Sequence, residues 1–183
     1  SEQFDNAAWI KNNTTVTANA ATAPDGTLTA DKIVEASNSL AKFVYNTVNI
    51  TSGAEVTEVI YAKAGERNFI NWDPSSKSGL TGYITFDLTL GTITRNTSSG
   101  GSITSSIALI ADGWYKLEVS YTIVDTGINH FWALSDGTAA ARPLYAGDGS
   151  SGLYVWGAHF FRSDLGGMVD NPATASSYVP TEA

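Results

Sequence analysis

Short segments in which apolar and polar residues alternate recur along the whole chain, and turns containing glycine separate them. A period of two is typical of strands that turn one face toward a core. Turn motifs stand at residues 24–26, 98–102, 111–113, 135–137 and 147–149. The segments between them are rich in β-branched and aromatic residues, which favour strands. The pattern predicts strands at residues 14–18, 30–36, 41–50, 56–64, 68–72, 83–88, 92–96, 102–110, 115–123, 130–135 and 153–161.

Helices are not favoured by the same pattern, because no window of a dozen residues keeps an apolar stripe at helical spacing. Only residues 1–8 could hold a single helical turn. We therefore expect an all-β protein, a two-sheet antiparallel β-sandwich of the jelly-roll type. With no internal repeat and no linker, residues 1–183 are interpreted as one domain, with an irregular tail from residue 163.

Strand parity separates the expected core face from the other face. In residues 56–64 the core parity includes Glu58, an unusual member of an otherwise apolar set, and leaves Tyr61 and Lys63 on the opposite face. Two further strands divide more clearly. Their core sets are Ile84, Phe86 and Leu88, and Tyr115, Leu117, Val119 and Tyr121.

The segment "GDGSSGLYVWGAHFF", residues 147–161, is apolar on both parities. A strand of this kind is typical of a central position that is covered on both sides. We therefore expect Trp156 to be buried. The two parity sets are Tyr154, Trp156, Ala158 and Phe160, and Leu153, Val155, Gly157, His159 and Phe161.

Charge and composition narrow the possible functions. The chain has 18 acidic and 10 basic residues, and the basic ones are scattered singly, so a nucleic-acid partner is not expected. No apolar run approaches a membrane span, and the absence of cysteine excludes disulfides, Cys-ligated zinc and thiol catalysis. The sequence begins at Ser1 without a leader, which suggests a piece of a longer protein or a mature form.

Seven stretches together carry a family resemblance: "SEQFDNAAW", "DGTLTADKIVEA", "YAKAGER", "FDLTLGTITR", "DGWYKLEVSYT", "GDGSSGLYVWGAHFF" and "SSYVPT". In this order they resemble β-sandwich modules attached to phage tail and structural proteins and to polysaccharide-active enzymes. That family is similar to the jelly-roll carbohydrate-binding modules associated with xylanases and glucanases. The resemblance spans nearly the whole chain.

The resemblance implies a non-catalytic module that docks on a polysaccharide or oligosaccharide, as part of a parent protein outside the cell or on a virion surface. No cofactor is required, but a structural calcium is implied, with Asp5 as the candidate ligand. Where calcium-binding relatives tend to carry an aspartate in the final strand, this chain has Trp156 and Gly157.

Glycan recognition needs a flat aromatic ring to cover the apolar face of a sugar, with polar groups beside it. The stretch "RNFINWDP" offers Trp72 as the ring, with Asn71, Asp73 and Arg67 as polar partners. The alternative is that Trp72 is a core residue at a strand end.

The stretch "NHFWALSDG" offers a second platform. If Phe131 faces the core, Trp132 and His130 lie on an open sheet face; otherwise Trp132 belongs to the core. Further candidate ligand residues are Tyr61, Lys63 and Tyr83, on the non-core parity of their strands, and the loop residues Tyr145 and Arg142. A solvated sheet face is the alternative for these positions.

Catalysis is not expected. Glu55 and Glu58 have opposite strand parity, so they do not form the carboxylate pair that a glycosidase needs. His130 and His159 lie in apolar strands with no supporting triad motif. The sequence therefore favours a carbohydrate-binding module. A structural or assembly module of a phage tail or fibre is the alternative, and a polysaccharide lyase or hydrolase is less favoured.

Overall fold

The computed structural model of the chain describes residues 3–74, 80–124 and 128–163. Within these described residues, twelve strands form two six-stranded antiparallel sheets. In spatial order, sheet A contains β1 (Ile10–Asn12), β4 (Phe43–Val48), β11 (Ile128–Ser135), β6 (Phe69–Asp73), β7 (Ile84–Asp87) and β8 (Thr92–Asn96). Sheet B contains β2 (Thr14–Ala21), β3 (Ala30–Glu35), β12 (Gly152–Arg162), β5 (Glu55–Lys63), β10 (Trp114–Thr122) and β9 (Ile103–Ala111).

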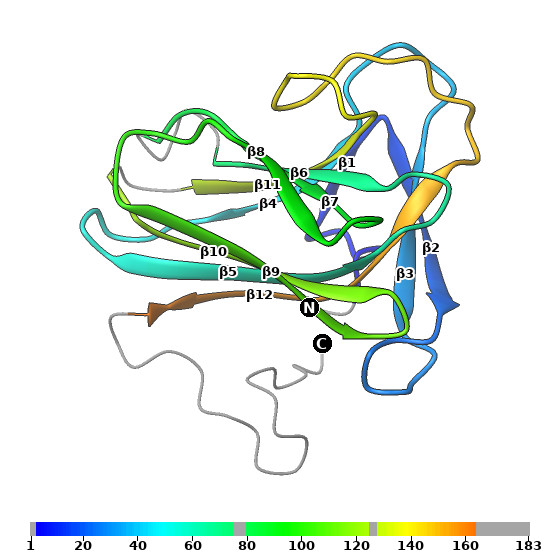
Figure 1. Cartoon of the computed structure of the whole chain (residues 1–183), viewed down its shortest axis with the longest axis horizontal. Helices are drawn as coiled ribbons and strands as arrows, with labels where there is room; N and C mark the ends of the chain where they lie inside the picture. Colours follow the sequence, from blue (N-terminus) through cyan, green and yellow to red (C-terminus); the bar gives the residue numbers. More distant parts are fainter. Residues whose placement is uncertain (1–2, 75–79, 125–127, 164–183) are drawn as a thin grey trace.

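The two sheets face each other as the layers of a sandwich (Figure 1). All eleven predicted strands are present, so the all-β two-sheet sandwich is confirmed, while the jelly-roll assignment stays a prediction. The strand β1 was not predicted. It passes into β2 of the other sheet through Asn13, whose φ of 50° turns the chain between the layers.

The N-terminal segment, from residue 3 to residue 9, forms turns and bends in place of the helical turn considered for it. Within the described part of the chain, no helix has the length and hydrophobicity of a membrane span.

The main core lies between the sheets and contains the residues that strand parity assigned to it. Leu117, Val119 and Tyr121 of β10, in sheet B, belong to the same buried cluster as Ile84 and Phe86 of β7, in sheet A. The N-terminal rings of Phe4 and Trp9 stack on each other in this core, 4.7 Å apart between centroids. Both rings are buried, so Trp9 is a residue of the main core.

A second buried cluster covers the outer face of sheet B. It includes Tyr61, Trp114 and Trp156, and the loop between β2 and β3 lies against it. The indole nitrogen of Trp114 donates a hydrogen bond to the carbonyl of Thr22 at 3.1 Å, and that of Trp156 donates to the Thr29 hydroxyl at 2.9 Å. This face is therefore not the open, solvated surface that Tyr61 would need as a ligand residue.

The strand β12 is central, as predicted, because it pairs with β3 on one side and β5 on the other. Its register shifts between Trp156 and His159, at Gly157, whose φ is 60°. A bulge of this kind reverses strand parity. The prediction that Ala158 and Phe160 share the face of Trp156 is therefore wrong, since both pack against the main core while Trp156 belongs to the second cluster.

Candidate functional site

Both tryptophans expected to stack on a sugar lie in the main core. Trp72 is 0% exposed and Trp132 is 2% exposed. They are direct cross-strand partners on the inner face of sheet A, and Trp72 also packs against Tyr121, 5.3 Å away between ring centroids. The expectation that either ring is free for stacking is therefore not met, and the alternative of a core tryptophan holds for both.

The opposite parity of the same strands forms the outer face of sheet A. There Phe131 pairs with Asp73 on one side and with Tyr45 on the other. The rings of Tyr45 and Phe131 stack with centroids 4.8 Å apart, and Phe43 meets Phe131 edge to face at 5.3 Å. Phe131 is nearly covered, but Phe43 and Tyr45 are half-buried, so aromatic surface remains accessible here.

Arg142 lies over this aromatic group. Its guanidinium carbon is 4.6 Å from the centroid of Phe131 and 5.3 Å from that of Phe43. Its Nε atom lies 2.9 Å from an Asp73 carboxylate oxygen. The Arg142 side chain is 37% exposed, so the ion pair fixes the guanidinium while leaving part of it in contact with solvent. Together, Phe43, Tyr45, Asp73, Phe131 and Arg142 are called the aromatic face below.

The loop that carries Arg142 is held to sheet A by Asn71. The Asn71 amide nitrogen donates to the carbonyls of Ala140 and Ala141, at 2.8 and 3.0 Å. Asn71 is completely buried beneath this loop. The structure therefore makes Asn71 a residue that positions Arg142, and its own side chain does not reach the surface.

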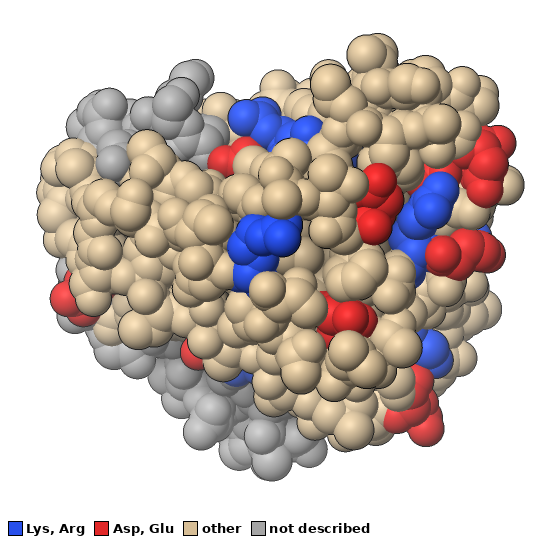
Figure 2. All heavy atoms as spheres, turned by 45° about the horizontal axis from the view of Figure 1, so that its top comes forward, with Lys and Arg blue, Asp and Glu red and all other residues tan. Residues whose placement is uncertain are grey.

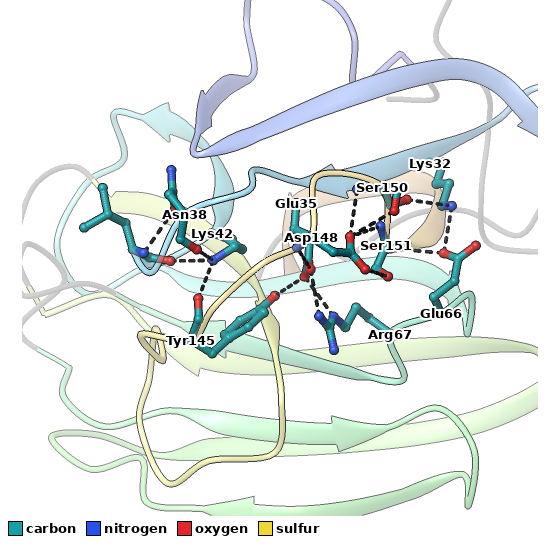
Figure 3. Close-up of polar contacts among 12 residues, drawn as sticks. Lys32, Glu35, Asn38, Lys42, Glu66, Arg67, Tyr145, Asp148, Ser150 and Ser151 are labelled. Atoms are coloured by element: carbon teal, nitrogen blue, oxygen red, sulfur yellow. Dashed lines mark hydrogen bonds and ion pairs between the residues drawn. The ribbon is translucent and has the colours of Figure 1, made fainter.

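Two more predicted ligand residues, Arg67 and Tyr145, meet at the carboxylate of Glu35 (Figure 3). Arg67 donates to both carboxylate oxygens, at 2.8 and 2.7 Å. The Tyr145 hydroxyl and the backbone N–H of Asp148 donate to the same carboxylate at 2.8 and 2.9 Å. Burial opposes ionisation, but these donors outweigh it and lower the pKa of Glu35.

The neighbouring Lys42 fixes the same loop at a second point. Its buried ammonium group donates to the carbonyls of Asn38, Leu40 and Tyr145, at 2.9, 2.8 and 2.7 Å (Figure 3). The ammonium also lies 4.1 Å from the centroid of the Tyr145 ring. Burial raises the pKa of Tyr145 and lowers that of Lys42. Arg67 and Tyr145 are thus used internally, to hold the loop of residues 136–151.

The remaining predicted ligand residues are dispersed. Tyr61 and Lys63 belong to β5 in sheet B, and Tyr61 is buried in the second cluster. Tyr83 precedes β7 in sheet A, and its hydroxyl accepts a hydrogen bond of 3.4 Å from Arg95. Of all the predicted ligand residues, only Asp73 and Arg142 are part of the aromatic face.

His130 faces the interior between the two sheets. Its Nδ1 atom lies 2.9 Å from a carboxylate oxygen of Glu58, and both side chains are nearly fully buried. The same oxygen accepts a hydrogen bond from the Tyr121 hydroxyl. Burial, reinforced by the Glu58 carboxylate, holds the pKa of Tyr121 well above its usual range. The unusual core position of Glu58 is thereby explained.

The calcium site implied for the N-terminal segment does not fit the described residues. Asp5 is exposed, and its backbone carbonyl accepts a hydrogen bond of 2.7 Å from the Lys11 ammonium, which also bonds the carbonyl of Asn6 at 2.6 Å. A cationic side chain is therefore already bound to these oxygens. Among the described residues, no group of three histidine, aspartate or glutamate side chains is arranged to hold a metal ion.

Charges of both signs are scattered over the face of the molecule shown in Figure 2, and most of that surface is uncharged. No extended basic patch is visible there. Acidic and basic side chains are thus interspersed on this face.

Sequence reasoning missed Phe43 and Tyr45. Both lie in "FVYNTV", where they alternate with Val44, a buried residue of the main core. Two aromatic side chains on the parity opposite to a buried valine are a usable signal for an aromatic outer face. For Phe131, strand parity alone allowed either this ring or Trp132 to face the core. The pairing of β11 with β4 and β6 decides between these alternatives.

No protein-family model matches the chain, and no curated protein matches it. Among solved structures, the enzymatically active domain of tailspike protein 4 from Bacteriophage CBA120 aligns with a TM-score of 0.49 and 12% sequence identity. The alignment covers 88% of this chain and 20% of that one, so the chain spans a fifth of the length of the matched protein. This likeness assigns no activity to the chain.

Proposed function

We propose that the protein is a non-catalytic glycan-binding module and that its aromatic face is the binding surface. The observation that carries the proposal is the half-buried Tyr45 ring, stacked on Phe131 and flanked by the Arg142–Asp73 ion pair. An accessible ring next to fixed hydrogen-bonding groups is the arrangement that sugar recognition requires.

In this proposal the Tyr45 ring covers the C–H face of a sugar, and the exposed nitrogens of Arg142 donate to its hydroxyls. The next row of the same outer face adds polar groups. There the Thr47 hydroxyl donates to the side-chain oxygen of Asn129 at 2.7 Å, which leaves the Asn129 amide nitrogen available as a donor. Strands β4 and β11 would then present a stacking ring and donors on one surface.

Preorganisation supports the proposal. Asn71, Glu35 and Lys42 all hold the loop of residues 136–151, so Arg142 does not have to be ordered when a ligand binds. A shallow site of this kind is expected to have a dissociation constant of roughly millimolar to micromolar. Retention on a polysaccharide would then depend on several copies in a parent protein, outside the cell or on a virion surface.

A glycan array of the purified chain tests this proposal, with Arg142→Ala as the matched variant. We expect signal on neutral, hydroxyl-rich glycans, because Arg142 is already paired with Asp73 and the whole chain is acidic. The Arg142→Ala signal should be weaker on the same glycans. Silence of the wild-type chain on the entire array would contradict the proposal and favour the second candidate, an assembly module that binds no sugar. Release of reducing ends from a bound glycan would favour a lyase or hydrolase.

A further inference from the structure

A cavity of about 130 Å³ lies between the two sheets, away from the aromatic face. It is lined on one side by β4 and β11 and on the other by β5 and β12, next to the bulge at Gly157. Trp9, Trp132 and Phe160 supply aromatic walls. Bulges often lie beside functional sites because they interrupt the ladder of a sheet and redirect side chains.

The polar part of this cavity has unused hydrogen-bonding capacity. His130 and Glu58 both line it. Although Nδ1 of His130 lies 2.9 Å from the Glu58 carboxylate, the contact lacks hydrogen-bond geometry, and Nε2 has no partner among the described residues. A buried polar atom without a partner is costly unless a ligand or solvent satisfies it. The imidazole is held edge-on against Phe160, 4.1 Å away between ring centroids.

The charge of the cavity lining selects a class of ligand. Among the described residues, the lining contains Glu58 but no lysine or arginine. Burial lowers the pKa of His159, the second histidine in the lining, which favours its neutral form. A carboxylate set among aromatic rings attracts cations through charge and through the ring faces. The half-buried amide of Asn46 adds a further acceptor for N–H groups.

The volume limits the size of that ligand. An apolar cavity of about 150 Å³ is large enough for benzene, so this one suits a molecule that is slightly smaller. A whole sugar ring with its hydroxyls is larger than that. We propose that the inter-sheet cavity binds a small organic ammonium ion, which pairs with Glu58, donates to Nε2 of His130 and packs its carbon atoms against Trp9 and Trp132.

The test is a titration of the purified chain with n-propylammonium chloride, followed by ¹H–¹⁵N NMR. The readouts are the indole N–H of Trp9, in the cavity wall, and that of Trp114, in the second cluster, as an internal reference. Neutral n-propanol and anionic propionate are the matched probes. We expect a saturable shift of Trp9 with a dissociation constant of roughly millimolar, no shift of Trp114, and a much weaker response to the two other probes.

Two variants complete the test. Glu58→Gln keeps the shape and removes the charge, and it should weaken n-propylammonium binding by about tenfold or more. Ala158→Val narrows the cavity without changing its charge and should also weaken binding. Tyr45→Ala should leave the titration unchanged, so this inference and the proposed glycan site can fail separately. Equal responses to all three probes, or no saturable shift in the wild-type chain, would show that the cavity holds solvent only and would overturn the inference.

Discussion

The guanidinium carbon of Arg142 lies 4.6 Å from the centroid of the Phe131 ring. The two residues come from different elements, a loop and a central strand, and Asp73 on the neighbouring strand fixes the guanidinium by an ion pair of 2.9 Å. A cation held over a ring at a partly exposed surface combines an apolar and a hydrogen-bonding contact in one place. This relationship is the basis of the proposed glycan site.

Replacing Arg142 tests that relationship. Arg142→Ala should weaken glycan binding by about tenfold, since the cation–π contact and the donors are lost together. Arg142→Lys should also weaken binding. The lysine ammonium is not planar, so it cannot stack on the Phe131 ring and pair with Asp73 at the same time as the guanidinium does. Isothermal titration calorimetry measures both. If Arg142→Lys binds as well as the wild type, the planar guanidinium is not what the site uses.

Glu35 should support the fold through its charge. Its folded-state pKa is lowered, so its contribution to stability is present above the unfolded value of 4.5 and is lost as the pH falls through the folded value. Glu35→Gln leaves Arg67 without its buried partner and should cost about 3 kcal/mol of unfolding free energy at pH 7. The difference between the two proteins should shrink below pH 4.5.

Urea denaturation at pH 7 and pH 3 measures this effect. Glu66→Gln is the matched control, because the Glu66 side chain is 55% exposed in its pair with Lys32 and an exposed pair contributes less than about 1 kcal/mol. A difference between wild type and Glu35→Gln that does not depend on pH would show that the carboxylate charge is not the source of the stability.

Replacing Trp72 distinguishes a role in the core from a role in glycan binding. Its indole nitrogen has no hydrogen-bond partner among the described residues, so Trp72→Phe loses mainly ring volume. We expect the unfolding free energy to fall by about 1–3 kcal/mol, while glycan affinity stays within twofold of the wild type, an expectation for a residue remote from the ligand. Loss of glycan binding in a fully folded Trp72→Phe variant would show that Trp72 contributes to the binding site.

Gly157 sets the geometry of the central strand β12. Its φ of 60° is disfavoured for residues with a Cβ atom, so Gly157→Ala should destabilise the fold by about 1–2 kcal/mol. Thermal unfolding measures this loss. An unchanged melting temperature would show that the bulge tolerates a side chain and that the parity reversal does not depend on glycine.

Alternation along the chain was sufficient to predict the strands and most of the core, because burial of one face leaves a period of two in the sequence. It failed at Gly157, where a bulge reverses the parity that alternation assumes. It also missed β1, whose three residues are too few to show a period.

The candidate site was harder to predict. In "NHFWALSDG" both parities are apolar, so sequence alone could not decide between Phe131 and Trp132. Arg67 and Tyr145 have the chemistry of ligand residues, yet Glu35 engages both of them, and Tyr145 is 110 positions away from it along the chain. Pairings of that sequence separation leave no local signal.

The most direct test of the glycan site is retention of the chain in a polysaccharide affinity gel, with Tyr45→Ala compared with Tyr154→Ala. Both tyrosines are half-buried, but Tyr154 lies on sheet B, in contact with the second cluster. We predict that a polysaccharide which retards the wild type also retards Tyr154→Ala and no longer retards Tyr45→Ala. Equal retardation of Tyr45→Ala and the wild type would contradict the account.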